Sequence, residues 1–207
     1  ATDDAGASAT QTFTVSVANT DDGPVASAQI TDQAATEDSG FSFQVPSNSF
    51  TDVDVGDHLA YTATLADGSA LPAWLTFDPA TRTFSGTPGN DDVGQVSVKI
   101  TATDDAGASA TQTFTVSVAN TNDGPVASAQ IADQAATEDA GFAFTVPANS
   151  FSDVDAGAPH AYTATLADGS ALPAWLTFDP ATRTFSGTPG NDDVGQVSVK
   201  ITATDDA

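Results

Sequence analysis

The chain repeats itself with a period of 101 residues. Trp74 recurs as Trp175 and Asp104 recurs as Asp205, and residues 1–106 align on 102–207 without a gap. A period of this length corresponds to a whole domain rather than to one turn of a solenoid. Near-identical domains in tandem are typical of a spacer, a stalk or a multivalent binder, and they argue against an enzyme.

The length and composition allow two domains that each have a core. The chain has 207 residues, of which 40% are hydrophobic, and domains of about 100 residues are common. It contains no Cys, which excludes disulfides, thiol catalysis and thiolate metal sites. No apolar stretch approaches the length of a membrane span, so direct membrane insertion is not expected.

The charge balance restricts the partners. There are 28 acidic residues and 4 basic ones, giving a formal net charge of −24. Such a surface repels nucleic acid and anionic membranes. Two interpretations remain open, an acidic surface that only confers solubility and a surface that binds divalent cations. The acids cluster rather than scatter, which favours the second.

Alternating hydrophobicity predicts β-strands and no long helix. In the segment SATQTFTVSVA, Phe114, Val116 and Val118 alternate with polar residues, the period-two pattern of a half-buried strand. About seven strands are expected in each unit, which favours an antiparallel β-sandwich. In the first unit they are predicted near 25–30, 40–45, 59–66, 74–78, 81–86, 95–103 and 109–119.

The repeat also predicts the domain boundaries. The junctions are the segments 19–24 and 120–125, which both end in Gly-Pro. Residues 1–20 are interpreted as the last strand of a preceding repeat, 25–120 as a complete sandwich and 126–207 as a second sandwich that lacks its last strand. Because Ser8–Ala18 is identical to Ser109–Ala119, we expect strand exchange between molecules, head to tail. A piece of a longer natural array is the alternative.

Hard oxygen donors are grouped at fixed places in each unit. Groups of Asp, Glu and Asn of this size suit Ca²⁺, which takes 6–8 oxygen ligands. The alternative for a single pair such as Asp52 and Asp54 is that it only caps a turn, because Asp accepts hydrogen bonds from its own backbone.

The order of these acids resembles a known family. The segments FTDVDVGDHLAYT, ITATDDAGASA and ANTNDGPVA are similar to the acidic motifs of cadherins. The segment LPAWLTFDPATRTFSGTP resembles still more closely the dystroglycan-type cadherin-like and Ig-like tandem repeats of large bacterial surface or secreted adhesins. The fold class expected from this is all-β, with tandem cadherin/Ig-like sandwiches.

The resemblance implies Ca²⁺ at the junctions between successive domains. The residues that match the ligand positions of cadherins are Asp21, Asp22, Glu37, Asp52, Asp54, Asp91, Asp92, Asp104, Asn122, Asp123, Asp153, Asp155 and Asp205. The match is incomplete at Asn90–Asp92, where cadherins have Asp-Arg-Glu.

The function expected from residues and resemblance together is a Ca²⁺-rigidified spacer or adhesion module of a large surface or secreted protein, whose parent is membrane-associated. Its partners would be neighbouring repeats. Two alternatives stay open, a carbohydrate-binding module attached to a polysaccharide-acting or biofilm protein, and a homophilic adhesion domain. An exposed Trp74 would favour binding of glycans, whereas a Trp74 packed in the core would favour the spacer. Catalysis has little support, because the two His residues do not occupy equivalent positions.

Overall fold

The computed structural model describes residues 1–207 except 3, 55, 156–160 and 206–207. The chain divides into two compact units, unit 1 from Ala1 to Ala119 and unit 2 from Asn120 to Ala207. Apart from the short 3₁₀ turns η1 (Asn90–Asp92) and η2 (Asn191–Asp193), the regular structure in the described part is β-strand. The predicted all-β class is therefore confirmed. No helix among the described residues is long and apolar enough to cross a membrane.

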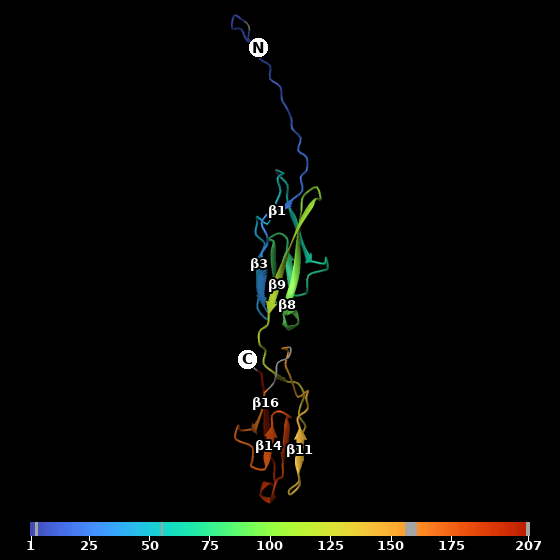
Figure 1. Ribbon diagram of the computed structural model, residues 1–207, viewed down its shortest axis with the longest axis vertical. Helices are drawn as coiled ribbons and strands as arrows, with labels where there is room; N and C mark the ends of the chain where they lie inside the picture. Colours follow the sequence, from blue (N-terminus) through green and yellow to red (C-terminus); the bar gives the residue numbers. More distant parts are fainter. Residues whose placement is uncertain (3, 55, 156–160, 206–207) are drawn as a thin grey trace. The chain divides into compact units, whose positions relative to one another are not determined.

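Unit 1 is a sandwich of two sheets (Figure 1). The larger sheet has the strand order β2 (Gln33–Thr36), β9 (Ser109–Ala119), β8 (Gly94–Thr103), β5 (Ala60–Leu65), and the smaller has β3 (Phe41–Gln44), β7 (Thr83–Gly86), β6 (Leu75–Asp78). A short antiparallel pair joins β1 (Val25–Ala26) to β4 (Phe50–Thr51).

The core of unit 1 forms where the two sheets face each other. On β9, Phe114, Val116 and Val118 are at most 4% exposed, while the residues between them point outward. The ring of Phe114 packs on Phe84 of β7 with centroids 5.5 Å apart. The period-two pattern of the sequence is thus the pattern of burial, because alternate side chains of a strand point to opposite faces.

Three strands of unit 1 differ from the prediction. The strand predicted over 25–30 ends at Ala26, and β2 and β4 were not predicted. β2 reads QAAT, in which Thr36 is the only β-branched residue and none is aromatic, so the composition that marks a strand is weak. It is a strand because it pairs in parallel with β9, with Gln33 opposite Val116, and such a long-range pairing leaves no local signal in the sequence.

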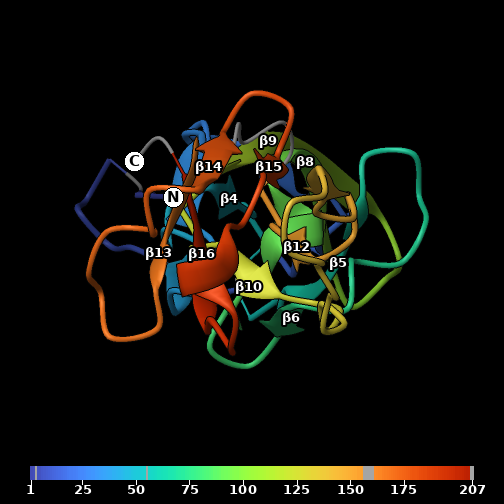
Figure 2. The same cartoon turned by 90° about the horizontal axis from the view of Figure 1, so that it is seen from below.

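Unit 2 repeats this plan with fewer paired strands. Its sheets are β10 (Val126–Ala127) with β12 (Phe151–Ser152), β11 (Phe142–Thr145) with β15 (Thr184–Gly187) and β14 (Leu176–Asp179), and β13 (Ala161–Leu166) with β16 (Val199–Thr204) (Figure 2). Within the described residues of unit 2, no strand occupies the place that β9 takes in unit 1. Val199, the counterpart of the fully buried Val98, is consequently 39% exposed.

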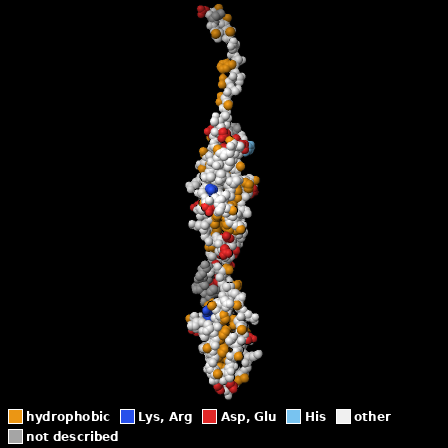
Figure 3. All heavy atoms as spheres, turned by 90° about the vertical axis from the view of Figure 1, so that its right-hand side faces the viewer, with side chains coloured by type: hydrophobic (Ala, Val, Ile, Leu, Met, Phe, Trp, Pro, Cys, Tyr) orange, Lys and Arg blue, Asp and Glu red, His pale blue; other side chains and the backbone are white. Residues whose placement is uncertain are grey.

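The segment that matches β9 in sequence, Ser8–Ala18, is extended and exposed in unit 1. Phe13, Val15 and Val17 are 87%, 72% and 90% exposed, and hydrophobic side chains line this segment in Figure 3. A strand with three large apolar side chains in water lacks the burial that would stabilise it.

Candidate metal centre

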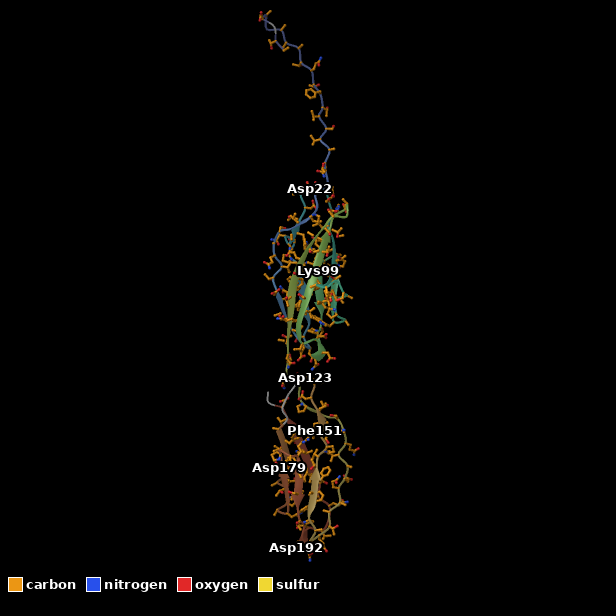
Figure 4. All side chains as sticks on the ribbon, turned by 45° about the vertical axis from the view of Figure 1, so that its right-hand side comes forward. Asp22, Lys99, Asp123, Phe151, Asp179 and Asp192 are labelled. Carbon is orange, nitrogen blue, oxygen red and sulfur yellow. The ribbon has the colours of Figure 1, made fainter. Side chains whose placement is uncertain are left out.

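The acids of unit 1 come together at one end because strand pairing brings three segments there. β1 pairs with β4, and β5 pairs with β8. The segment before β1, the loop between β4 and β5 and the turn after β8 therefore meet, and Figure 4 shows Asp22 at this end. We call this group the Asp54 cluster; its members are Asp21, Asp22, Asp52, Asp54, Asp57 and Asp104.

The carboxylate of Asp54 is held by hydrogen bonds to both oxygens. The side-chain amide of Asn19 donates to Oδ1 at 2.8 Å, and the backbone N–H of Asp22 donates to Oδ2 at 2.7 Å. These bonds, the backbone one first, lower the pKa of Asp54 below the ordinary value of an Asp. Asp52 Oδ1 in turn accepts from the backbone N–H of Asp54 at 3.0 Å. The loop therefore presents a fixed, ionised group.

One carboxylate oxygen of Asp104 stabilises the turn that follows β8. Its Oδ1 accepts from the backbone N–H groups of Ala106, Gly107 and Ala108 at 3.0, 2.7 and 2.8 Å. Asp104 is 6% exposed, and among the described residues its Oδ2 is buried without a hydrogen-bond partner. A buried carboxylate oxygen in that state is costly unless a cation or a donor pairs with it. Turn capping and metal binding thus do not exclude each other here, because each would use a different oxygen.

Three carboxylates of the cluster lie close enough to share one ion. One oxygen each of Asp21, Asp54 and Asp57 lies within 4.8 Å of the others. Burial, followed by the charge of Asp104, raises the pKa of Asp21. Burial also raises the pKa of Asp57, with the charge of Asp105 as the next cause. Neighbouring anions oppose ionisation in this way, and a divalent cation would remove the repulsion. A set of ligands that consists only of carboxylate oxygens, with no nitrogen or sulfur, fits Ca²⁺.

In unit 2 the equivalent residues hold the carboxylate of Asp155 by the same hydrogen bonds that hold Asp54 in unit 1. Asn120 Nδ2 donates to Asp155 Oδ1 at 2.9 Å, and the backbone N–H of Asp123 donates to Asp155 Oδ2 at 2.7 Å. Asp153 Oδ1 accepts from the backbone N–H of Asp155 at 2.9 Å. Asn122 Nδ2 donates to Asp205 Oδ2 at 2.9 Å. The structure therefore brings together the ligands predicted for each Asp-x-Asp loop and its linker.

The remaining predicted ligands lie at the other end of unit 1. Asp91 and Asp92 precede β8, whereas Asp104 follows it, and a strand of this length spans about 30 Å. Glu37 follows β2, and its backbone N–H donates to the carbonyl oxygen of Ala119 at 3.0 Å. Asp92 Oδ2 accepts from the backbone N–H of Gly89 at 3.0 Å. Within one unit these acids are not part of the Asp54 cluster.

The sequence prediction missed Asp57. It lies in the same loop as Asp52 and Asp54, and among the described residues its Oδ2 is buried without a hydrogen-bond partner. The only signal in the sequence is a third acid soon after the Asp-x-Asp pair. That signal is absent from the second repeat, where the equivalent position is Ala158, which lies outside the described residues.

Trp74 is partly buried and packs against the core of unit 1. It contacts the core cluster of unit 1, and its ring meets Phe41 edge-on with centroids 6.1 Å apart. Trp175 makes the same contact with Phe142 at 6.3 Å. These rings are not an exposed platform on which a sugar could stack, so the observation favours the spacer over the carbohydrate-binding module.

A family model with the description "Putative Ig domain" matches residues 23–119 and 124–207. The two matches cover most of the chain, one in each unit. The chain belongs to this family of Ig-like domains. The expected resemblance to Ig-like repeats of bacterial adhesins is thereby confirmed, and each unit is an Ig-like repeat.

Part of the chain is also similar in sequence to curated staphylococcal proteins. The chain is 34% identical over 137 residues to the "Serine-rich adhesin for platelets" of Staphylococcus aureus strain USA300. The protein of the same name from strain MRSA252 matches at the same identity. The match takes in 66% of this chain but only 5% and 9% of these relatives.

Among solved structures, the extracellular cadherin domains 1–4 of protocadherin gamma B7 match 89% of this chain and 50% of that one, with a TM-score of 0.51 and 18% identity. This similarity supports a cadherin-like fold for the Ig-like repeats. An endo-fucoidan hydrolase from glycoside hydrolase family 107 matches 87% of this chain and 28% of that one, with a TM-score of 0.41 and 23% identity.

Proposed function

We propose that this protein is a Ca²⁺-rigidified tandem spacer of Ig-like repeats within a large adhesin. The single observation that carries the proposal is the Asp54 cluster, in which Asp21, Asp54 and Asp57 converge beside the buried Oδ2 of Asp104. The carboxylate of Asp155 accepts the equivalent hydrogen bonds, so the arrangement is a property of the repeat. No catalytic role is part of the proposal.

The chemistry of the site follows from its charges. Asp54 is held ionised by two donors, so it would be the anchoring ligand. Without a cation, the neighbouring carboxylates repel one another, and the loops that carry them separate more easily. A bound Ca²⁺ would offset that repulsion and hold the linker segment against the loop between β4 and β5. Rigidification of the junction requires in addition that the ion takes oxygens of the adjoining repeat.

The proposed location is the cell surface or the extracellular space, with neighbouring repeats as partners. It is supported by the name of the staphylococcal relatives, which are adhesins, and by the cadherin ectodomain with the same fold. Since the chain spans only a small part of these relatives, the receptor of the whole protein is a separate question.

Calorimetric titration of the full chain with Ca²⁺ tests the metal. The wild type should give binding heats that are lost when Asp52→Ala and Asp54→Ala are combined with Asp153→Ala and Asp155→Ala. Matched controls remove the same charges from turns outside the clusters, with Asp67→Ala, Asp78→Ala, Asp168→Ala and Asp179→Ala. These four acids are bound by neighbouring Ser or Thr residues instead. Equal heats in both variants would contradict the assignment.

Small-angle scattering tests the rigidification. The maximum dimension should be longer and better defined in Ca²⁺ than in chelator, while the circular dichroism of the strands stays unchanged. If Ca²⁺ binds but the scattering profiles coincide, the ion stabilises single repeats and does not rigidify the array.

A further inference from the structure

The strand β5 lies at an edge of the larger sheet of unit 1, where one of its two sides is paired. It pairs with β8 over all six of its residues in regular register, from Ala60 opposite Thr103 to Leu65 opposite Val98. An edge strand presents a row of backbone N–H and C=O groups to which another strand can add. β5 is therefore a place where the fold can accept a partner strand.

Two hydrogen bonds show which backbone groups of β5 point away from β8. The N–H of Ala66, just after the strand, donates to the carbonyl oxygen of Ser97 on β8 at 2.9 Å. The N–H of Leu65 points the other way and donates to the carbonyl oxygen of Ser69 in its own hairpin at 2.9 Å. Since hydrogen-bonded positions recur at every second residue of an antiparallel pair, the even-numbered residues of β5 face β8 and the odd-numbered ones face the open side.

Tyr61 and Ala63 are the odd-numbered residues of β5 whose outward groups have no partner. Leu65 uses its own outward groups within the hairpin, because its carbonyl oxygen accepts from the N–H of Gly68 at 2.9 Å. Within the described part of the chain, no such bond reaches the N–H and C=O groups of Tyr61 and Ala63. The open edge of β5 therefore consists of two residues that lie symmetrically on either side of Thr62.

β5 lacks the features that keep an edge strand from pairing. It has six residues, AYTATL, without a charge, a Pro or a bulge. The other edge strands of the two sheets, β2, β3 and β6, have four residues each. β6 ends in Asp78 followed by Pro79, and β2 is flanked by Asp32 and Glu37. Because short length, charge and Pro are the usual protection of an edge, β5 is the least protected edge of unit 1.

The charges of unit 1 favour the approach of a like chain at this edge. Lys99 and Asp78 are the only charged residues in the described strands of the unit, and Figure 4 shows Lys99 in the middle of the unit. Lys99 lies opposite Thr64 of β5, and the guanidinium of Arg82 lies over the ring of Tyr61, 5.7 Å from its centroid. Two chains that each carry a net charge of −24 therefore repel each other least where they meet at β5.

We propose that β5 pairs antiparallel with β5 of a second copy of this chain, about a twofold axis at Thr62. A twofold rotation places Tyr61 opposite Ala63 of the second copy and Ala63 opposite its Tyr61, so each of these two pairs exchanges two hydrogen bonds. A second copy is thus the partner that matches the edge, and the contact is isologous. The pairing uses no ligand of the Asp54 cluster, so it holds or fails independently of Ca²⁺ binding.

The second repeat carries the same edge sequence. β13 also reads AYTATL and pairs with β16 in the register that β5 has with β8. The N–H of Leu166 donates to the carbonyl oxygen of Ser170 at 2.9 Å, as Leu65 does to Ser69 in unit 1. The chain therefore offers two such edges, and a test of association has to change both.

Disulfide trapping tests the register, because the chain has no Cys of its own. A chain with Thr62→Cys should form a disulfide-linked dimer, since the opposed Cα atoms would be about 4.5 Å apart, within the range of a disulfide. A chain with Thr64→Cys should not do so alone, but it should cross-link to a separate chain with Ala60→Cys, which it faces in this register. No dimer from Thr62→Cys, or equal yields from Thr62→Cys and Thr64→Cys alone, would overturn the pairing.

Charge substitution tests association in the full chain by analytical ultracentrifugation. Thr62 and its counterpart Thr163 are both exposed, so a charge at these positions leaves the cores intact. Like charges directly opposite each other destabilise a strand pair, and Thr62→Lys combined with Thr163→Lys should weaken association by roughly tenfold. Thr62→Asp combined with Thr163→Asp should do the same. An equimolar mixture of the Lys chain and the Asp chain should restore association, because opposite charges then face each other.

The matched control places the same charges on the other sheet. Thr76→Lys combined with Thr177→Lys changes exposed positions of β6 and β14, and association should stay near the wild-type value. An equal loss in this control, or no rescue in the mixture, would contradict the contact at β5. A wild-type chain that remains monomeric at millimolar concentration would show that β5 does not bind a second copy.

Discussion

Gly86 lies directly against the carbonyl group of Trp74. A Cβ atom at position 86 would be 1.7 Å from the carbonyl oxygen and 3.2 Å from Cε3 of the indole ring. The same relationship holds between Gly187 and Trp175, at 1.8 and 3.2 Å. In each unit the chain therefore requires Gly on the strand opposite the tryptophan, because only Gly lets β6 and β7, or β14 and β15, approach so closely.

Gly86→Ala should destabilise unit 1 by about 1–3 kcal/mol, the usual cost of forcing extra atoms into packed structure. Chemical denaturation followed by Trp fluorescence measures it. Gly40→Ala is the matched control, since a Cβ there would meet nothing within 4 Å. Equal midpoints for the two variants would mean that the strands can separate at no cost.

The two repeats should bind Ca²⁺ with different affinity. Unit 1 has Asp21 and Asp57 where the second repeat has Asn122 and Ala158, and affinity rises with the number of charged ligands. Asp57→Asn should weaken the tighter class of sites by about tenfold, and Ala158→Asp should strengthen the weaker one, both measured by calorimetry. A single class of identical sites in the wild type would rule this out.

Two substitutions of Asp104 should distinguish the role of Oδ1 in stability from the role of Oδ2 in Ca²⁺ binding. Asp104→Ala removes the acceptor of three backbone bonds and should cost about 1–3 kcal/mol of unfolding free energy. Asp104→Asn keeps an acceptor at Oδ1 and should retain most of the stability, yet it should lose Ca²⁺ affinity because the free oxygen becomes a neutral amide. Thermal unfolding and calorimetry on the same samples give both quantities. An Asn variant with wild-type Ca²⁺ affinity would remove Asp104 from the site.

Acid should destabilise the repeats partly through their turn aspartates. Thr81 Oγ1 donates to Asp78 Oδ2 at 2.8 Å, and this bond, with the backbone N–H of Ala80, lowers the pKa of Asp78. A lowered pKa in the folded state stabilises the fold above the pKa of the unfolded chain, and that stabilisation is lost as pH falls through the folded pKa. Asp78→Asn should therefore show a smaller drop in Tm than the wild type between about pH 6 and about pH 3. Asp4→Asn, which removes an exposed charge from the turn that precedes Ser8, should follow the wild-type curve.

The strands with strong alternation were predictable, and the weak ones were not. β8 and β9 carry inward residues such as Ile100 and Val116 at every second position, so their existence follows from local pattern. β2 has only Ala35 as a buried residue, and its parallel pairing with β9 joins residues far apart in sequence. No local propensity encodes such a contact.

Within the candidate site, the Asp-x-Asp pairs were predictable because their spacing is a local motif. The different roles of the two carboxylate oxygens of Asp104 were not predictable, since they depend on where the turn to Ala108 places three backbone N–H groups. Asp57 was not predicted either, because its loop is the most divergent part of the repeat. Only the packing of that loop beside Asp21 brings its carboxylate into the cluster.

The sequence by itself determined that the protein is a tandem pair of β-sandwich repeats with acidic ends, because period-two burial and a 101-residue repeat are written directly in the order of residues. The tertiary structure decided which carboxylate oxygens lie close together and which strands are paired in a sheet. The same eleven residues are a buried strand as Ser109–Ala119 and an exposed segment as Ser8–Ala18. The physical reason is that a strand gains its stability from the sheet beside it, and that neighbour is a property of the fold rather than of the strand.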